Sequence, residues 1–414
     1  MKALRFDRKP ARYAAAIVAG KLAPGAGAGV GPLRLADVDP PELPGPDWLR
    51  IAPRLAGICG SDLGTIDGTS SRYFEPIVSF PFVPGHEVVA DLLDPLDATD
   101  GSGPLAPDGT HRVVLEPVLG CAARSISPTC AACAAGDLGR CTNISFGHLS
   151  PGLQSGFCCE TGGGWSTGMV AHRSQLHRVP DDMTDEAAVM VEPTACAVHA
   201  ALAAGIAPGD TVVVLGAGTL GLLVLAAVRR YTQAGTVIVV AKHDAQRTLA
   251  RSLGADVVVA PGEIRRAVRR STGSMAIGDG DITRLTGGAA CVLDCVGSAP
   301  SLDDSMAVTR PGGQITLVGM AGVTNLDLTG LWHRELRLVG AYAYGTETLV
   351  DGTSRRTFDL ASELVMADDL ARLVSATYPL SRYREAIAHA ASAGGRGAVK
   401  VCFDLRTEKE RTRL

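Results

Sequence analysis

The sequence predicts an α/β fold with a parallel, doubly wound sheet, joined to a second domain that is mostly β. Between residues 211 and 318, hydrophobic runs of strand length alternate with helix-like stretches, which is typical of βαβ units and a parallel sheet. Residues 1–190 instead carry short β-like runs among many Gly and Pro residues, which favours an irregular antiparallel domain. The length of 414 residues also favours two domains over one.

The individual elements follow from the same patterns. The expected strands of the parallel sheet are 211–215, 236–240, 257–260, 291–294, 314–318 and 337–341, and the helices between them are 219–230, 245–253 and 301–309. Short strands are expected in the first domain at 88–90, 113–115 and 169–171, with loops at 25–31 and 94–109. After Gly345 the chain is expected to turn helical and to end on a strand at 398–403 that returns to the first domain.

Composition excludes several classes of function. The net charge of −4 and the lack of a basic block argue against a nucleic-acid partner. The chain carries no apolar run long enough to span a membrane, and its N-terminus lacks the apolar core of a signal peptide, so a cytoplasmic protein is expected. In a reducing compartment, clustered cysteines indicate metal binding more often than disulfides.

A glycine-rich motif follows the first strand of the parallel sheet and opens a helix. Its residues are Gly216, Ala217, Gly218, Thr219, Leu220 and Gly221. In this setting a G-x-G-x-x-G motif indicates dinucleotide binding: Gly216 permits a tight turn, Gly218 lets the backbone approach the pyrophosphate, and Gly221 lets helix and strand pack closely. The helix N-terminus offers free N–H groups to the phosphates. The sequence therefore predicts a Rossmann-type NAD(P) site.

The end of the second strand bears on the choice between NAD and NADP. A carboxylate at this position would bind the ribose 2′-hydroxyl of NAD, but here the strand ends in Ala241 and Lys242, and Asp244 comes later. Lys242, and Arg247 one turn into the helix, could pair with a 2′-phosphate. This favours NADP over NAD, with the alternative that both residues are solvated surface charges.

Four cysteines have the spacing of a zinc knuckle. Cys130 and Cys133 are separated by two residues, Cys141 follows, and Cys121 supplies a fourth thiolate. Four thiolates around one zinc make a closed structural site, which would stabilise a loop that has little core of its own. The alternative is a set of free thiols.

A second set of metal-ligating residues is dispersed along the chain. Cys59 lies in the sequence GICGSD, His86 and Glu87 in PGHE, and Glu192 in VEP. Together they supply one thiolate, one imidazole and one or two carboxylates, which suits a catalytic zinc with a position open to water or substrate.

These motifs, with GAGTLG and a terminal KVCF, carry a resemblance over nearly the whole chain. The sequence resembles the zinc-containing branch of the medium-chain dehydrogenase/reductase superfamily, and is most similar to the sorbitol, threonine and glucose dehydrogenases. The resemblance implies a GroES-like catalytic domain formed by 1–195 and completed by 345–414, around a Rossmann domain at 196–344. It also implies a homodimer or homotetramer.

The resemblance assigns roles to the residues of the dispersed set. Cys59 and His86 match the family's catalytic zinc ligands, and Glu192 matches the carboxylate that replaces a cysteine ligand of ordinary alcohol dehydrogenases. Glu87 matches a residue that binds the metal directly in some members and lies behind the ligands in others. Asp62 matches the residue that orients the zinc-bound imidazole.

Other positions match the proton relay and the nicotinamide end. Ser61 matches the hydroxyl that passes on the alcohol proton, and Val296 and Val318 match segments near the nicotinamide. Many relatives have a His three residues after the relay residue, where this chain has Gly64, so the proton would leave by another route. Trp165 either lines the substrate pocket or is a core aromatic.

The predicted function is hydride transfer between an alcohol or polyol, or the matching carbonyl compound, and NAD(P), with catalytic and structural zinc. The expected partner is a small molecule, and polyol, amino alcohol, sugar and simple secondary alcohol all remain open. Two alternatives are a zinc-free enone or quinone reductase of the same superfamily and a non-catalytic dinucleotide-binding protein. The first should lack the set of Cys59, His86 and Glu192, so the sequence disfavours it.

Overall fold

The computed structural model describes residues 1–94, 111–279 and 282–408, and the predicted loop at 94–109 lies almost wholly outside them. The chain forms two compact units. Unit 1 contains Met1–Glu192, Asp369–Ala393 and Lys400–Leu414, and unit 2 contains Pro193–Asp368 and Gly394–Val399. Within the described residues, no helix has both the length and the apolar character that crossing a membrane requires.

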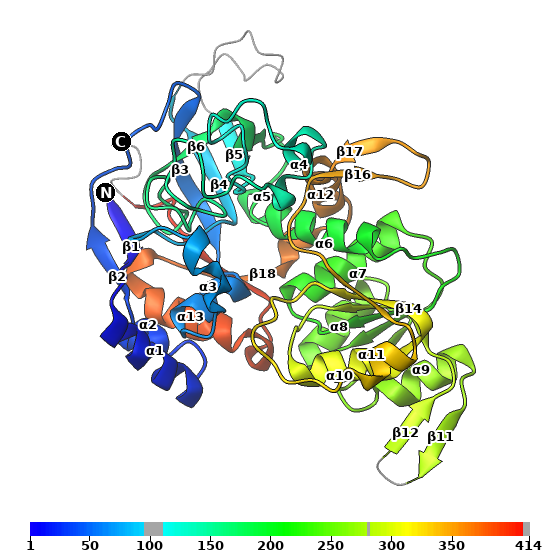
Figure 1. The fold of residues 1–414 in the computed structure, drawn as a ribbon. Helices are drawn as coiled ribbons and strands as arrows, with labels where there is room; N and C mark the ends of the chain where they lie inside the picture. Colours follow the sequence, from blue (N-terminus) through cyan, green and yellow to red (C-terminus); the bar gives the residue numbers. More distant parts are fainter. Residues whose placement is uncertain (95–110, 280–281, 409–414) are drawn as a thin grey trace. The chain divides into compact units, whose positions relative to one another are not determined.

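Unit 2 is built on a six-stranded parallel sheet, as predicted (Figure 1). Its order is β10-β9-β8-β13-β14-β15, which reverses direction between β8 and β13. The strands are β8 (Val212–Leu215), β9 (Val237–Val240), β10 (Val257–Val259), β13 (Ala289–Asp294), β14 (Thr309–Leu317) and β15 (Arg337–Gly340). This order is the doubly wound arrangement in which ligands bind where the strand order reverses.

Burial on both faces explains why these strands read as continuous hydrophobic runs. Val213 packs with the apolar side of one covering helix, whereas its neighbours Val212 and Val214 point to the opposite face and are also fully buried. The helices of unit 2, with α6 beginning at the boundary, are α6 (Val191–Ala203), α7 (Thr219–Tyr231), α8 (Asp244–Ser252), α9 (Ile264–Thr272), α10 (Ala299–Val308), α11 (Thr329–His333) and α12 (Thr357–Ala367).

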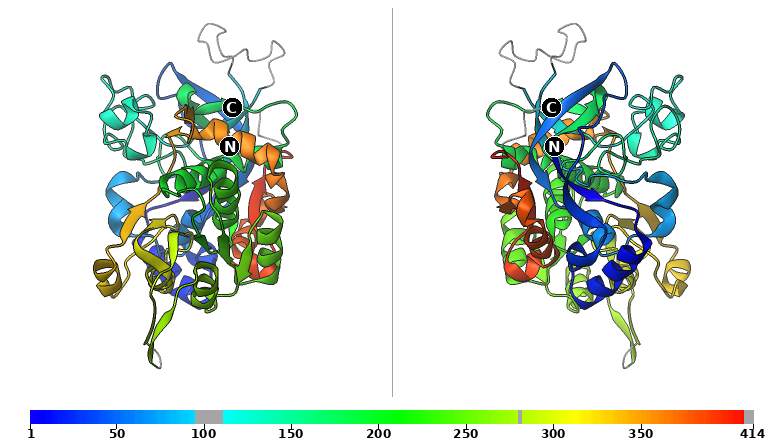
Figure 2. Two further views of the ribbon diagram at one scale, coloured as in Figure 1. Left: turned by 90° about the vertical axis from the view of Figure 1, so that its right-hand side faces the viewer. Right: turned by 90° about the vertical axis from the view of Figure 1, so that its left-hand side faces the viewer.

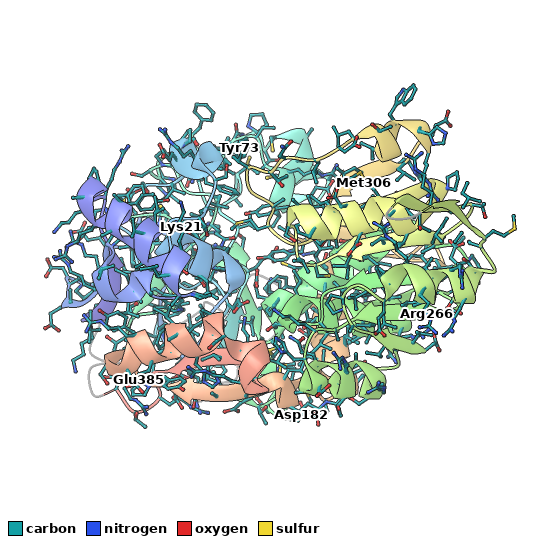
Figure 3. All side chains as sticks on the ribbon, turned by 90° about the horizontal axis from the view of Figure 1, so that it is seen from below. Lys21, Tyr73, Asp182, Arg266, Met306 and Glu385 are labelled. Atoms are coloured by element: carbon teal, nitrogen blue, oxygen red, sulfur yellow. The ribbon has the colours of Figure 1, made fainter. Side chains whose placement is uncertain are left out.

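Helix α9 shows how the pattern of side chains directs this packing. Ile264 and Val268 are buried against the sheet, while Arg266 and the other arginines of the helix face solvent, as Figure 3 marks for Arg266. Met306 of α10, also marked in Figure 3, is buried in a small cluster with Ile315. The apolar stripe of each helix therefore covers the sheet.

Two hairpins of unit 2 were absent from the sequence-based expectation. The hairpin of β11 (Ala276–Asp279) and β12 (Ile282–Leu285) extends away from the sheet in every view (Figures 1 and 2). The second, of β16 (Thr346–Thr348) and β17 (Ser354–Arg356), precedes α12 where a helix was expected directly after Gly345. Strands of three or four residues are too short to show a reliable alternation.

Unit 1 contains a seven-stranded, mostly antiparallel sheet of order β18-β19-β3-β4-β5-β7, with β6 also pairing β3. Its strands are β3 (Trp48–Gly57), β4 (Val88–Leu92), β5 (His111–Leu115), β6 (Met169–His172), β7 (Leu176–Arg178), β18 (Val374–Tyr378) and β19 (Lys400–Asp404). A separate ladder joins β1 (Lys2–Phe6) to β2 (Leu33–Asp37). The terminal strand β19 pairs with β3, so the end of the chain returns to the first unit as expected.

Helices of unit 1 are α1 (Pro10–Leu22), α2 (Gly27–Val30), α3 (Gly60–Ile66), α4 (Ala131–Ala134), α5 (Asp185–Ala188) and α13 (Tyr383–Ala391). Helix α1 was missed because its many alanines show no apolar periodicity, although Pro10 at its start and its alanine content favour a helix. The expected loop at 25–31 contains α2, and the amides of Gly25, before this helix, and Gly27, at its start, donate to the carboxylate of Asp67 at 2.7 and 3.0 Å.

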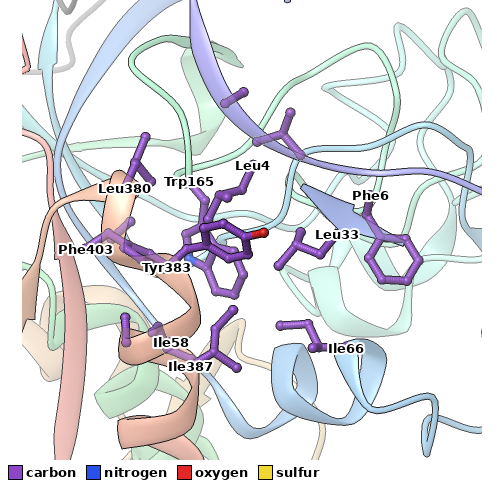
Figure 4. Packing of buried hydrophobic residues seen from close by; sticks show 14 of the residues in the cluster. Leu4, Phe6, Leu33, Ile58, Ile66, Trp165, Leu380, Tyr383, Ile387 and Phe403 are labelled. Carbon is purple, nitrogen blue, oxygen red and sulfur yellow. The ribbon is translucent and has the colours of Figure 1, made fainter. Parts of the chain in front are cut away.

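The main core of unit 1 brings the two ends of the chain together (Figure 4). Leu4 and Leu33 come from the first strands, Ile66 from α3, and Ile387 and Phe403 from the C-terminal segment. Trp165 is fully buried in this core, and its indole N–H donates to Gly57 O at 3.1 Å. Trp165 is thus a core aromatic, the second of the two readings that the sequence allowed.

The boundary between the units differs from the predicted domain boundary. Residues 345–368, expected to belong with the first domain, lie in unit 2, where α12 packs on α7 and Tyr231 Oη donates to Leu360 O at 2.6 Å. The short segment Gly394–Val399 also lies in unit 2, and Thr219 Oγ1 donates to Val399 O at 3.1 Å.

Candidate functional site

The cysteine quartet Cys121, Cys130, Cys133 and Cys141 gathers in one lobe of unit 1. All four sulfur atoms lie within 4.8 Å of one another, which no other potential metal-binding group among the described residues achieves. The Sγ–Sγ distances are 3.7 Å for Cys121–Cys141 and 3.9 Å for Cys130–Cys141. Zn–S bonds of about 2.3 Å in a tetrahedron require S–S edges of about 3.8 Å, so the quartet fits a zinc ion.

Local backbone structure sets this geometry. Cys130 is the N-cap of α4, so Cys133 lies one turn later with its amide directed at the Cys130 sulfur. The Cys130 amide donates to Cys121 Sγ at 3.4 Å, and the Asn143 amide donates to Cys141 Sγ at 3.4 Å. The Asn143 side chain also donates to Cys121 Sγ at 3.2 Å. These N–H groups compensate the negative charge of bound thiolates.

The second site is built around the start of α3. Cys59 is the N-cap of this helix, and its amide donates to Asp62 Oδ2 at 2.9 Å. His86 follows Gly85, whose φ of +100° and close approach to Trp165 admit only glycine, since a Cβ there would lie 2.5 Å from the indole. The segment with Gly85 thus places His86 beside Cys59 and Asp62 at the N-terminus of α3.

Asp62 lies beside the imidazole of His86. Asp62 Oδ1 lies 3.6 Å from His86 Nδ1, and both side chains are almost completely buried. Burial by itself lowers the pKa of His86. The charge of Asp62, the hydrogen bond to Cys59 and the charges of Cys59 and Glu192 have the opposite and larger effect, and together they raise this pKa to about 10. Burial raises the pKa of Asp62. Since Nδ1 faces Asp62, the other ring nitrogen, Nε2, is directed away from it.

Glu87 pairs with a buried lysine. Lys400 Nζ forms an ion pair with Glu87 Oε2 and donates to Ile58 O at 3.4 Å, and the two side chains are at most 3% exposed. Burial lowers the pKa of Lys400, but Glu87 and Cys59 raise it above the usual value. Gly57 leaves space for this pair, because a Cβ there would lie 1.9 Å from Glu87 Oε2.

Glu192 and Ser61 complete the predicted set. Glu192 lies in the first turn of α6, is 5% exposed and is close enough for its charge to act on His86. Ser61 is partly exposed in the first turn of α3. Cys59, His86 and Glu192 therefore belong to one neighbourhood of unit 1, but they are more widely spaced than the cysteine quartet.

The dinucleotide motif lies at the switch point of the sheet in unit 2. Gly216 has a φ of +95°, and a Cβ there would lie 2.6 Å from Val296 Cγ2 on the neighbouring connection. A Cβ on Gly221 would lie 1.8 Å from Gly216 O, whereas a Cβ on Gly218 would meet open space. Gly218 is the N-cap of α7, so the helix N-terminus faces this opening. Val318 directly follows β14, and its amide N–H donates a hydrogen bond to Asp294 O at 2.9 Å.

The residues after β9 are arranged around Arg247. Its guanidinium donates to Ala241 O at 3.1 Å, to Lys242 O at 3.0 Å and to Asp244 Oδ1 at 2.7 Å. Lys242 has an exposed side chain. Arg247 thus stabilises the loop and neutralises Asp244, while Lys242 extends into solvent.

Comparisons with known proteins give the family. The model of the alcohol dehydrogenase GroES-like domain matches residues 45–181, and that of the zinc-binding dehydrogenase matches residues 219–355. The chain is a zinc-containing medium-chain dehydrogenase/reductase of the sorbitol dehydrogenase-like branch. It is 27% identical over 382 residues to L-idonate 5-dehydrogenase of Vitis vinifera, covering 90% of this chain and 93% of that protein. It is 26% identical over 377 residues to sorbitol dehydrogenase of Arabidopsis thaliana, covering 87% and 89%.

Solved structures share the fold of this dehydrogenase. Galactitol-1-phosphate dehydrogenase of Escherichia coli superposes with a TM-score of 0.69 at 21% identity, covering 98% of this chain and 100% of that one. A chain of Sinorhizobium meliloti 1021 bound to NADP gives a TM-score of 0.68 at 24% identity, covering 97% and 98%. The predicted combination of a GroES-like domain and a Rossmann domain is confirmed.

Two buried charged residues near the candidate sites, Arg124 and Lys400, escaped sequence reasoning. Arg124 is fully buried in the lobe of the quartet, where its guanidinium donates to the carbonyls of Leu119, Phe146, Leu149, Ser150 and Gly152. No sequence pattern marks it, because its partners are backbone atoms. Lys400 lies in the KVCF motif, but only the pairing of β19 with β3 brings it to Glu87.

The ion pair of Lys400 and Glu87 predicts a non-additive effect on stability. Lys400→Met should lower the free energy of unfolding by about 3 to 5 kcal/mol, because it leaves a carboxylate buried without its partner. Adding Glu87→Gln should restore most of the loss, which urea denaturation of the four variants in a double-mutant cycle measures. As a control, Arg72→Met removes an exposed ion pair with Glu75 and should leave the urea concentration at the unfolding midpoint unchanged. Equal losses in Lys400→Met and the double variant would contradict the prediction.

Proposed function

We propose that this chain is a zinc-dependent dehydrogenase that transfers a hydride between an alcohol or polyol and NAD(P). One observation carries the proposal: the partly buried thiol of Cys59 and the buried imidazole and carboxylate of His86 and Glu192 lie on a chain whose parallel sheet has a glycine-rich turn at its switch point. The names of the relatives support the polyol class, since the grapevine protein is an idonate dehydrogenase and the Arabidopsis protein a sorbitol dehydrogenase.

Cys59, His86 and Glu192 would hold the catalytic zinc, and the cysteine quartet would hold a structural zinc. The donor set suits the metal, because thiolate, imidazole and carboxylate are all common zinc ligands. When bound, the catalytic zinc supplies a Lewis acid that polarises the substrate oxygen and lowers its pKa.

The protein's own residues prepare this chemistry. Asp62 holds the His86 ring by its Nδ1 side, which leaves Nε2 for the metal. Lys400 forms an ion pair with Glu87, so this buried carboxylate has a partner within the protein itself. Ser61, partly exposed at the start of α3, would accept the proton of the substrate hydroxyl.

The ligand set can be tested at Cys59. Cys59→Ala should remove one of two zinc ions per chain and lower turnover by at least about a thousandfold, because several kcal/mol of transition-state stabilisation are lost. Dinucleotide affinity, measured by nicotinamide fluorescence, should stay within about twofold, since the glycine motif lies in the other unit. Cys291→Ala, a buried cysteine of β13, is the matched control and should keep both zinc ions and turnover. Turnover like that of the unmodified protein in zinc-depleted Cys59→Ala would rule out the mechanism.

We propose NADP as the preferred cofactor. The carboxylate nearest the end of β9, Asp244, is paired with Arg247, and the exposed Lys242 is free to approach a 2′-phosphate. A fold relative bound to NADP is consistent with this choice.

Replacing Lys242 should change the affinity for NADP but not the affinity for NAD. Lys242→Ala should weaken NADP binding by about tenfold and leave NAD binding unchanged, because only the 2′-phosphate meets the ammonium group. Calorimetric titration of each dinucleotide measures the effect, and Arg251→Ala, an exposed basic residue in the last turn of α8, is the control. An equal loss for NAD and NADP would refute the assignment.

We propose a homodimer, or a homotetramer built from such dimers, that pairs through β15. This strand ends the six-stranded sheet, and Leu338 and Val339 are 45% and 37% exposed on it, with Trp332 nearby in the chain at 79%. An edge strand with apolar side chains is a template for pairing with a second copy.

Reduced thiols are needed by both proposed metal sites, which suits a cytoplasmic enzyme.

A charge on the edge strand tests the pairing. Val339→Lys should shift the protein to monomers at micromolar concentration, because a lysine opposes edge-to-edge association. Light scattering after size-exclusion chromatography measures the mass. Val18→Lys places the same change on an exposed position of α1 and should leave the mass unaltered. An unchanged oligomer in Val339→Lys would exclude this interface.

A further inference from the structure

A fully buried acidic side chain lies at the carboxyl end of the parallel sheet of unit 2, on the strand next to the glycine-rich turn. Asp294 is the last residue of β13, and it pairs with Leu215 of β8 on one side and with Leu317 of β14 on the other. Its side chain is 0% exposed. A buried carboxyl group is costly unless its oxygen atoms have hydrogen-bond partners, so its contacts indicate its role.

Asp294 accepts hydrogen bonds from two separate connections of the sheet. Its side-chain Oδ1 accepts from the amides of Val296 at 2.9 Å and Gly297 at 3.0 Å, in the connection that follows β13. Its backbone O accepts from the amides of Val318 and Gly319, both at 2.9 Å, in the connection that follows β14. One residue therefore fixes four backbone amides.

The two connections pack directly on each other through their backbones, at a contact of residues 296–297 with 318–319 that we call the crossing. A Cβ on Gly319 would lie 2.6 Å from Val296 C and 2.8 Å from Gly297 N, and a Cβ on Gly297 would lie 2.7 Å from Gly319 O. Gly297 also has a φ of +72°, a conformation that favours glycine. Because the backbones are so close, the hydrogen bonds to Asp294 set the position of both.

The second side-chain oxygen of Asp294 makes no comparable contribution. Oδ2 is buried and has no hydrogen-bond partner among the residues that the structure describes. A buried polar atom without a partner lowers stability, and such atoms in folded proteins call for an explanation, often a functional one. Stability alone therefore does not account for an acidic residue at this position.

The crossing lies on the nicotinamide side of the switch point. In a doubly wound sheet a dinucleotide lies across the reversal of strand order, with its pyrophosphate at the helix after the first strand and its adenosine ribose at the end of the second. Here these places are the start of α7 and the end of β9. The other half of the dinucleotide therefore extends over the ends of β13 and β14, where Val296 is 46% exposed.

We propose that Asp294 is a positioning residue for the nicotinamide ring, because it fixes the crossing against which the ring binds. The proposal rests on the proposed function, since it requires that the chain bind a nicotinamide dinucleotide. Asp294 acts only through the crossing, so its loss should reduce the contribution of the ring to affinity and spare the contributions of the adenosine and the pyrophosphate. Oδ1 only accepts hydrogen bonds, so an amide oxygen can replace it.

The test compares each dinucleotide with the same molecule lacking nicotinamide. Full-length, zinc-replete protein is titrated calorimetrically with NADP, NAD, 2′-phospho-ADP-ribose and ADP-ribose. Asp294→Ala should weaken the binding of both dinucleotides by at least about tenfold, because two amides lose their acceptor, and should change the binding of the two ribose compounds by less than about twofold. Asp294→Asn should restore most of the affinity for the dinucleotides.

A second variant disturbs the crossing without touching the carboxyl group. Gly319→Ala places a Cβ against Val296 C and forces the two connections apart, so it should cause the same selective loss as Asp294→Ala. If Asp294→Ala does not fold, Gly319→Ala decides the question. Cys291→Ala, at a buried position earlier in β13, is the control and should bind all four compounds like the unmodified protein.

Three outcomes would overturn the proposal. The first is an equal loss for dinucleotides and ribose compounds in Asp294→Ala, which a purely structural role predicts. The second is binding by Asp294→Asn as weak as that by Asp294→Ala, and the third is unchanged binding by Gly319→Ala. Since no readout requires turnover, a lack of hydride transfer would refute the proposed function and leave these binding results in force. An unmodified protein that binds neither dinucleotide would overturn both proposals.

Discussion

The constraint on which unit 1 depends is that ionised groups buried away from water must have partners. Asp62 and His86 face each other with both side chains almost completely buried, and Lys400 forms an ion pair with Glu87 beside them. Each of these charges would be too costly alone. The network therefore holds the backbone of α3, the turn before β4 and strand β19 in one arrangement, and this arrangement defines the proposed metal site.

A similar constraint operates in the lobe of the cysteine quartet. Polar interactions hold its loops together: amide N–H groups donate to cysteine sulfur atoms, and the Arg124 guanidinium donates to five backbone carbonyls. A zinc ion would add four further constraints to the same loops.

Much of the fold was predictable because its signals are local. The strands of the parallel sheet are buried on both faces and so read as uninterrupted apolar runs, and the glycines at 216 and 221 are required by turns within the same short segment. Helix α1 and the hairpin of β11 and β12 were missed, since alanine gives no amphipathic period and short strands give little alternation. Residues 345–368 were expected in the first domain but lie in unit 2, because α12 packs on α7.

The sequence by itself determined the fold class, the dinucleotide motif and the chemical types of the candidate ligands, because each depends on residues close together in the chain. The tertiary structure decided which groups meet. Only folding brings Lys400 to Glu87, engages Arg247 with the loop after β9, and brings the Val318 amide to Asp294 O. Such contacts join distant residues or depend on burial, and one-dimensional spacing carries information about neither.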